Sequence, residues 1–260
     1  MRILVTNDDG INAPGLGVLE EIARRLSDDV WVVAPETNQS GASHSLTLHE
    51  PLRCEEVAPR KFAVRGTPTD CVIMGMRHIL LESPPALVLS GVNRGANLAE
   101  DVTYSGTIAG AIEGALLGIR SIAMSLTTGF DDEGRIHWET AAEHGPGIVA
   151  RLLAAPWEPG VLVNVNYPDL PPEAVAGVRV TTQGRRDQGL LNIDQRIDTW
   201  GTPYYWFNLE RHKSNPAEGT DLWAIYQGFI SLTPLAPDLT HPAACAALAS
   251  VFADPSPAPT

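Results

Sequence analysis

The sequence is short of positive charge. Its 260 residues include 18 Lys and Arg against 31 Asp and Glu, which leaves a formal net charge of -13 at pH 7. A protein that binds a nucleic acid polymer needs clustered Lys and Arg to neutralise the phosphates. The composition therefore disfavours such a partner. An anionic substrate would have to be attracted locally, and a bound metal ion would serve that purpose.

Cysteine is scarce as well. The three cysteines, Cys54, Cys71 and Cys245, are far apart and form no C-x-x-C pair. This argues against a disulfide framework and against a thiolate metal site. It indicates free thiols in a reducing compartment, the cytoplasm.

Long apolar runs are missing, although 44% of the residues are apolar and 19% charged, as in ordinary globular proteins. No run approaches the ~18 residues of a membrane helix. The N-terminus reaches Asp8 and Asp9 too soon for the apolar stretch of a signal peptide. We therefore expect a cytoplasmic protein with no membrane partner.

Several nucleotide and hydrolase motifs are absent. The sequence has no G-x-x-x-x-G-K-[ST] loop, no G-x-G-x-x-G after the first predicted strand and no G-x-S-x-G. Phosphatases with an aspartyl nucleophile of the haloacid dehalogenase type need two Asp residues two positions apart, and Gly10 occupies the second position here. A covalent phosphoaspartate is therefore disfavoured.

Short apolar runs alternate with helical patterns through the first half of the chain. Uniformly apolar strands separated by helices predict a parallel sheet covered on both faces. The expected fold is α/β, a Rossmann-like three-layer core with a mostly parallel sheet, over residues 1–168. The predicted strands cover 3–5, 30–33, 86–89, 122–124 and 161–163, and predicted helices cover 16–26, 107–117 and 138–153. A further helix is predicted to start at Thr67, with Thr67 as N-cap, Pro68 in the first position and Asp70 in the first turn.

The pattern changes in the C-terminal part, residues 169–252. Residues 184–219 are polar, aromatic and irregular, which is too long a stretch for a simple surface loop. They predict an extended arm or hairpin used in oligomerisation, or else a hairpin folded on its own domain. A strand pattern returns over 225–232. The Pro-rich tail, 253–260, is predicted to be disordered.

The basic segment Arg185-Arg186 lies at the start of this arm, followed by Asp187. It could reach an active site from the arm, but the sequence favours a surface ion pair.

Polar residues follow the first strand directly, in the segment Asn7-Asp8-Asp9-Gly10. Ligands of parallel α/β sheets bind beyond the carboxyl ends of the strands. Two adjacent carboxylates at such a place are hard oxygen ligands suited to Mg²⁺ or Mn²⁺. Taken alone, the same composition is also typical of a plain turn.

Three further polar segments, 38–41, 90–97 and 105–107, follow strands or begin a helix and can converge on the same crevice. Their oxygens and the two carboxylates together would form an all-oxygen metal site. The predicted metal ligands are Asp8, Asp9, Ser40 and Asn93.

An anion site is predicted beside the metal. The amides that begin the helix near Thr107, with the positive end of its dipole, favour a phosphate. His44 either assists proton transfer or makes a structural hydrogen bond. A metal that makes water nucleophilic, together with donors for charged oxygens, is what phosphate ester hydrolysis needs. The predicted catalytic residues are Asp8, Asp9 and Asn97, and the predicted phosphate-binding residues are Asn97, Ser105, Gly106, Thr107 and His44.

Several of these segments recur in order along one known family. The ordered motifs are residues 2–11, 33–35, 40–45, 66–72, 90–97, 105–114, 121–123, 219–221 and 228–235. In these motifs the chain resembles the SurE family of 5'/3'-nucleotidases, densely over residues 1 to about 126 and in patches beyond, by the order of strands and loops.

The resemblance implies a divalent-metal phosphatase that acts on nucleoside 5'- and 3'-monophosphates, with short polyphosphate as a further substrate. It implies one metal ion per subunit, Mg²⁺ or Mn²⁺, at the same four ligands. It also implies a homodimer or homotetramer in which a C-terminal arm embraces a neighbour.

Two alternatives remain open. A metal-dependent nucleotide-sugar transferase would also use an acidic pair to hold a metal and a phosphate. A non-catalytic nucleotide sensor would keep the fold and bind without turnover.

Overall fold

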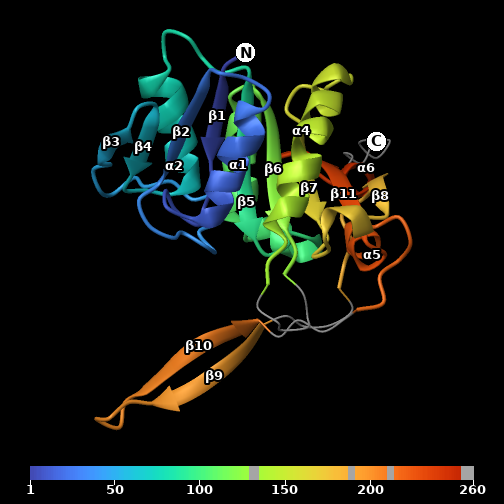
Figure 1. The fold of residues 1–260 in the computed structure, drawn as a ribbon. Helices are drawn as coiled ribbons and strands as arrows, with labels where there is room; N and C mark the ends of the chain where they lie inside the picture. The colour runs from blue at the N-terminus through green and yellow to red at the C-terminus, as the bar shows by residue number, and fades with distance from the viewer. Residues whose placement is uncertain (129–134, 187–190, 210–213, 253–260) are drawn as a thin grey trace, which may run out of the picture.

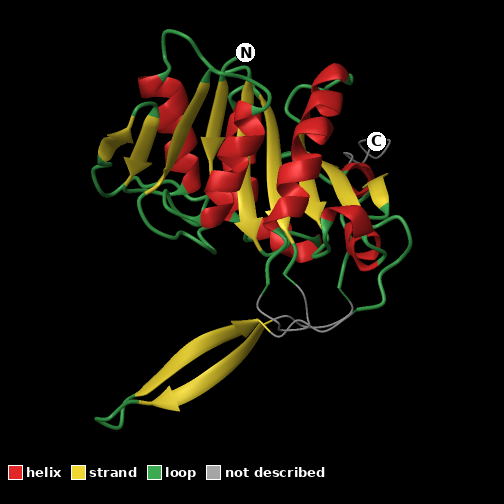
Figure 2. Cartoon of the chain, viewed as in Figure 1, coloured by secondary structure: helices red, strands yellow, loops and turns green. Residues whose placement is uncertain are grey.

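In the computed structural model of the chain, residues 1–128, 135–186, 191–209 and 214–252 are described. They form a nine-stranded sheet with helices on both faces and a separate two-stranded hairpin (Figures 1 and 2). The predicted α/β class, with a mostly parallel sheet between two layers of helices, is thereby confirmed.

The large sheet has the strand order β3-β4-β2-β1-β5-β6-β7-β11-β8. Neighbouring strands are parallel except at β3–β4 and at β7–β11, which are antiparallel. Its strands are β1 (Ile3–Thr6), β2 (Val30–Pro35), β3 (Cys54–Ala58), β4 (Lys61–Val64), β5 (Leu87–Arg94), β6 (Arg120–Leu126), β7 (Leu162–Tyr167), β8 (Gly177–Val180) and β11 (Phe229–Leu235). The hairpin consists of β9 (Leu191–Ile197) and β10 (Pro203–Leu209).

Two pairs of helices cover the sheet. Helices α1 and α4 contact each other on one face, and α2 and α3 contact each other on the opposite face. The helices are α1 (Pro14–Arg24), α2 (Pro68–Met74), α3 (Gly106–Leu116), α4 (Trp138–Ala154), α5 (Asp221–Tyr226) and α6 (Pro242–Phe252), with short turns η1 (Gly75–Ile79), η2 (Ala99–Thr103) and η3 (Pro172–Ala174).

Strand β1 lies inside the sheet between β2 and β5, and all of its side chains are buried. Because side chains alternate along a strand, Ile3 and Val5 belong to the cluster under α1, which includes Leu19. Leu4 belongs to the opposite cluster, which includes Val72 of α2. Burial on both faces explains why this strand is apolar throughout, and it anchors the segment that follows Thr6.

The prediction for the loop after residue 89 is wrong in one respect. Strand β5 runs on to Arg94, so the segment from Ser90 to Asn93 belongs to the strand. The neighbouring strand β6 carries it, because Asn93 pairs with Ser125 and Arg94 with Leu126 after an irregularity in register. Polar composition had indicated a loop, but pairing with β6 overrides it.

The predicted strand over 225–232 is wrong at its start. Thr220 caps helix α5, its hydroxyl accepting from the Trp223 N–H, and the helix continues to Tyr226. Gly228, with a φ of 77°, then turns the chain into β11. Strand β3 was missed, because its residues are exposed and lack the apolar alternation of a half-buried strand.

The C-terminal part contributes to the core and also leaves it. Strands β8 and β11 complete the same sheet, whereas β9 and β10 form an antiparallel hairpin that stands clear of it (Figure 1). Trp206 of the hairpin is 60% exposed and Phe207 is 80% exposed. The division at residue 168 and the role in oligomerisation stay predictions. The predicted disordered tail lies outside the described residues.

Among the described residues, no helix combines the length and the apolar character needed to cross a membrane.

Candidate active site

The first functional segment is the turn after β1. Asn7 closes it, because its Nδ2 donates to the Gly10 carbonyl at 3.0 Å and its Oδ1 accepts from the Gly10 N–H at 3.3 Å. Gly10 has a φ of 103°, which favours glycine. Asn7 therefore stabilises the turn. The carboxylates of Asp8 and Asp9, which lie within the turn, make their contacts with other segments.

Asp8 is a buried carboxylate, 4% exposed. Its Oδ1 accepts a hydrogen bond from the Thr107 hydroxyl at 2.5 Å. Its pKa is raised from 3.8 to about 6: burial is the main cause and the nearby charge of Asp9 adds to it, while the hydrogen bonds from Thr107 oppose the rise. Among the described residues, no cation contributes to this balance. A buried carboxylate without a cation is costly, so this position favours a positively charged ligand.

Asp9 lies half-buried next to it. Its Oδ1 accepts from Asn38 Nδ2 at 3.4 Å, and its Oδ2 accepts from the Arg94 backbone N–H at 3.3 Å. Burial raises its pKa, while the N–H and the charge of Arg94 lower it. Asp9 thus connects the segment after β2 to the end of β5.

The segment after β2 carries Ser40 to the same edge of the sheet. The Gln39 N–H donates to the Asp8 carbonyl at 2.7 Å, and the Ser40 N–H donates to Asn38 Oδ1 at 2.8 Å. Ser40 is exposed. The backbone of Asp8 and the side chain of Asn38 therefore hold the loop that carries Ser40.

Asn93 comes from the end of β5, directly before Arg94. Its Nδ2 donates to the Gly95 carbonyl at 2.9 Å. This contact fixes the orientation of the amide group, and the oxygen predicted to bind metal is the other end of the same amide. A Cβ on Gly91, earlier in the strand, would lie 2.1 Å from the Met124 carbonyl oxygen, so the close approach of β5 and β6 here requires glycine.

Helix α3 begins against Asp8. Ser105 is its N-cap, and its hydroxyl accepts from the Ile108 N–H at 3.0 Å. A Cβ on Gly106 would lie 2.7 Å from Asp8 Cβ and 3.0 Å from Asp8 Oδ2. The absence of a side chain at Gly106 thus allows the helix to start in contact with the carboxylate. The hydroxyl of Thr107 donates to Asp8, and the phosphate contact predicted for Thr107 would come from the backbone amides at the start of the helix.

Asn97 lies in the buried loop between β5 and α3. Its Nδ2 donates to the Ser125 hydroxyl at 2.8 Å. Its backbone N–H donates to Asn166 Oδ1 at 2.9 Å. The loop is thereby fixed to β6 and β7, and the phosphate contact predicted for the Asn97 side chain would come from its amide oxygen.

His44 lies in the loop that follows Ser40 and reaches across α3. Its Nε2 lies 3.0 Å from Glu113 Oε2, and the adjacent Ser43 hydroxyl donates to the Thr103 carbonyl at 2.8 Å. A carboxylate on one ring nitrogen fixes the orientation of the imidazole. The sequence left a structural hydrogen bond open as one role of His44, and Glu113 is the partner for such a bond.

The predicted residues thus fall into two groups. Direct hydrogen bonds join Asp8 and Asp9 to Thr107, the 38–40 segment and the end of β5. In the part of the chain that the structure describes, none joins Asn97 or His44 to either carboxylate. Sequence reasoning placed the segment of Asn38 at this crevice without naming Asn38 as a partner, and it missed the partners Glu113 and Ser125 because only the fold brings them close. The described residues hold no group of three or more His, Cys, Asp and Glu suited to a metal, so a site here would also need amide or hydroxyl ligands.

With this geometry established, comparison with known proteins decides the family. A family model described as "Survival protein SurE" matches residues 3–189. The chain belongs to the SurE family.

Two relatives of similar length share the same name. A protein of Methylobacterium nodulans called 5'-nucleotidase SurE is 61% identical over 97% of this chain and 100% of its own. One of Parvibaculum lavamentivorans with the same name is 58% identical over 93% of this chain and 87% of its own. The crystal structure of the SurE protein from Aquifex aeolicus matches with a TM-score of 0.84 at 41% identity, over 96% of this chain and 99% of that one. The region matched by the SurE model contains every predicted site residue.

Proposed function

We propose that this chain is a divalent-metal-dependent phosphomonoesterase that hydrolyses nucleoside 5'- and 3'-monophosphates, and short polyphosphate as a further substrate. The observation that carries the proposal is the Asp8–Asp9 pair at the carboxyl edge of the sheet, with the start of α3 against it. The shared name 5'-nucleotidase of the SurE relatives supports the activity.

The donor atoms fit a hard divalent cation. Asp8 is buried without a cation among the described residues, and Asp9 adds a second carboxylate beside it. Ser40 and Asn93 would add a hydroxyl and an amide oxygen, and Mg²⁺ and Mn²⁺ prefer such ligands. We assign one ion per subunit to these four residues. When bound, the ion would supply Lewis acidity toward a phosphoryl oxygen and lower the pKa of water.

The chain's own residues have separate tasks in this proposal. Thr107 holds the Asp8 carboxylate through its hydroxyl, so that Asp8 acts as a ligand of fixed orientation. Asp9 is a second ligand and accepts a proton from the attacking water. Asn97, Ser105, Gly106, Thr107 and His44 are assigned to the phosphate, the α3 residues through the helix start and its dipole.

No protein nucleophile takes part in the proposed reaction. Asp8, the residue that a covalent mechanism would use, has one oxygen bound by Thr107 and a pKa raised by burial. Trapping a phosphorylated Asp or Ser during turnover would refute direct hydrolysis.

We also propose that the chain forms a homodimer or homotetramer through its hairpin. The support is the exposed aromatic surface of β10, because apolar patches of this kind mark protein interfaces.

The first experiment is phosphate release from 5'-AMP and 3'-AMP with Mn²⁺, Mg²⁺ or EDTA. The proposal predicts release with metal and none with EDTA. Pyrophosphate and tripolyphosphate in parallel reactions test the further substrates.

Either alternative would give a different result. A nucleotide-sugar transferase would hydrolyse simple monophosphates negligibly and would need a sugar acceptor. A nucleotide sensor would bind AMP tightly and release no phosphate over hours. A folded, metal-loaded chain that releases none would therefore overturn the phosphatase proposal.

A further inference from the structure

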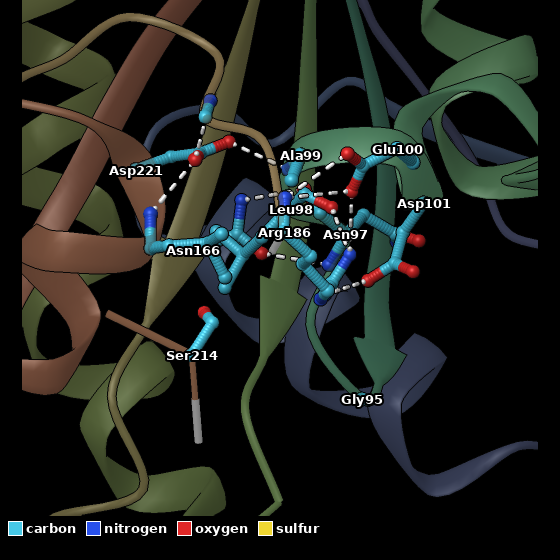
Figure 3. Close-up of polar contacts among 12 residues, drawn as sticks. Gly95, Asn97, Leu98, Ala99, Glu100, Asp101, Asn166, Arg186, Ser214 and Asp221 are labelled. Carbon is cyan, nitrogen blue, oxygen red and sulfur yellow. Dashed lines mark hydrogen bonds and ion pairs between the residues drawn. The ribbon is translucent and has the colours of Figure 1, made fainter. Parts of the chain in front are cut away.

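The loop that carries Asn97 is held mostly by side chains from distant parts of the chain (Figure 3). On one side, β7 supplies two asparagines. Asn166 accepts from the Asn97 N–H at 2.9 Å and donates to the Asn97 carbonyl at 3.2 Å. Asn164 donates to the same carbonyl at 2.8 Å. A buried backbone without regular structure needs such partners, so they define the course of the loop.

On the other side, Leu98 and Ala99 are held by residues 183–186, which we call the root of the hairpin arm, and by Asp221. Arg186 donates to the Leu98 carbonyl at 3.1 Å, and Gln183 Nε2 donates to the Ala99 carbonyl at 2.8 Å. The Ala99 N–H donates to Asp221 Oδ2 at 2.9 Å. Ala99 has a φ of 50°, a conformation that is unfavourable for alanine. These contacts therefore maintain a strained point two residues after Asn97.

Arg186 is the centre of this arrangement, with a side chain only 7% exposed. It pairs with Asp101 at 2.7 Å and with Glu100 at 3.4 Å, and its own backbone N–H donates to Glu100 at 3.0 Å. The surface ion pair that the sequence favoured for this segment is thus a buried one, while Asp187 lies outside the described residues. The planar guanidinium donates to the Leu98 carbonyl and to both acids in a fixed fork, a geometry that the compact ammonium of a lysine does not reproduce.

Asp221 joins the same root to the loop from the start of α5. Besides Ala99, its carboxylate accepts from the Gly184 N–H at 2.8 Å and from the Leu222 N–H at 2.7 Å. One carboxylate therefore ties three segments together: the Asn97 loop, the residues that lead into the arm, and α5. Figure 3 shows Asp221 and Arg186 converging on Leu98 and Ala99 from the C-terminal part of the chain.

We infer that Arg186 and Asp221 are positioning residues that set the place of Asn97, so that the root of the hairpin arm forms part of the substrate site. The inference rests on the proposed function, in which Asn97 contacts the phosphate. The metal ligands Asp8, Asp9 and Ser40 are held by other contacts. Substrate binding should therefore depend on Arg186 far more than metal binding does.

The test compares Arg186→Ala, Arg186→Lys and the control Arg24→Ala in the full chain. Arg24 forms a surface ion pair with Glu20, and Glu20 keeps Lys61 as a partner in that control. For Arg186→Ala, kcat/KM for 5'-AMP should fall roughly tenfold to a hundredfold, chiefly through KM. The Kd for Mn²⁺, measured by calorimetry, should stay within about twofold. Arg186→Lys should recover part of the lost affinity, and Arg24→Ala should match the native chain.

Two milder variants keep the test decisive if Arg186→Ala does not fold. Gln183→Ala removes one contact to Ala99, and Asp221→Asn places an amide N–H against one of the three N–H donors. Both should raise KM with Mn²⁺ affinity unchanged. Light scattering on each variant separates this effect from a change of assembly, because a change of mass without a change of KM would count against the inference.

The failures are distinguishable. A native chain that binds Mn²⁺ yet releases no phosphate from 5'-AMP refutes the proposed function, and this inference with it. An active native chain whose folded Arg186 and Asp221 variants keep the native KM refutes the inference alone. Variants in which Mn²⁺ affinity falls while KM rises also refute it, because a general loss of structure would then explain the result.

Discussion

Strand β1 and the hairpin strand β10 differ in the burial of their side chains. Every residue of β1 is buried, with one face under α1 and the other under α2. In β10, by contrast, Tyr205, Trp206 and Phe207 are each at least 60% exposed. The same chain thus completes its core around the carboxylate pair and leaves its most aromatic strand without a covering layer.

The difference shows where each region obtains its order. The turn after β1 is held by contacts within the chain, from Asn7 to the start of α3. Among the described residues, the hairpin is held by its own antiparallel ladder over seven residue pairs and by a few contacts within itself, and an isolated hairpin is marginally stable in water. Changes in the first region should therefore alter chemistry and stability, and changes in the second should alter assembly.

The largest expected effect belongs to Asp8→Asn. The substitution keeps the shape of the side chain but removes a charged ligand, so phosphate release from 5'-AMP should fall at least about a hundredfold. Phosphate release at saturating Mn²⁺ measures it, and circular dichroism should show an intact fold. Asp28→Asn, on the surface, is the matched control and should keep native activity. Native activity in Asp8→Asn would remove Asp8 from the site.

Metal binding should weaken at acidic pH, because the buried Asp8 carboxylate takes up a proton there. The pKa of Asp8 is raised to about 6. Below that pH a proton occupies the carboxylate and must leave before a metal binds, so Mn²⁺ affinity should fall about tenfold for each pH unit under 6.

Calorimetric titrations of Mn²⁺ at pH 5, 6, 7 and 8 would show this dependence. The native affinity should change little between pH 7 and pH 8. In Asp8→Asn the residual affinity should lose most of its dependence between pH 5 and pH 6. An equal affinity at pH 5 and pH 7 in the native chain would contradict the assignment.

A smaller effect is expected for Gly106→Ala. The added Cβ would lie 2.7 Å from Asp8 Cβ, so Asp8 or the start of α3 must shift. Overpacking of this kind costs about 1–3 kcal/mol of unfolding free energy. Urea unfolding and phosphate release should both report it.

Gly17→Ala is the matched control, because nothing lies within 4 Å of a Cβ at that position in α1. It should stabilise the chain by up to ~1 kcal/mol through helix propensity and leave activity unchanged. A Gly106→Ala variant as active as Gly17→Ala would show that contact between Asp8 and α3 is dispensable.

The smallest effect on the stability of the single chain is expected for Phe207→Ser. Its ring is 80% exposed, so the unfolding free energy of the monomer should change by less than about 0.5 kcal/mol. The mass in light scattering should nevertheless fall toward the 27.9 kDa of one chain. Leu89→Ala, at a buried position of β5, should show the reverse: a loss of about 2–5 kcal/mol with the assembly kept. An unchanged mass for Phe207→Ser would argue against assembly through the hairpin.

The parts of the fold that could be predicted are those in which local sequence and tertiary structure agree. The run Ile3-Leu4-Val5 is apolar because both faces of β1 are buried. The start of α2 follows from its capping box, in which Thr67 and Asp70 exchange side-chain and backbone hydrogen bonds. In such segments the sequence near each residue already contains the physical cause of its structure.

The rest depended on residues far apart in the sequence. Nothing near Asn93 indicates that it continues a strand, because the partner that makes it so is Ser125 in β6. Arg186 was assigned to the surface, since the acids that bury it lie more than 80 positions earlier. The four predicted metal ligands were selected by residue type and by position after strands, and their assignment as ligands stays a prediction.

The place of β11 also sets when this chain can finish folding during synthesis. Strand β11 lies between β7 and β8, pairing with both, although it is made after the whole hairpin. A nascent chain that ends before residue 229 therefore lacks the strand that connects β8 to the sheet, and the edge of β7 stays open. Unpaired edges of this kind invite association with other chains. The ribosome must deliver the polypeptide through β11 before this side of the sheet closes, so a truncation that removes β11 should harm more of the fold than its length suggests.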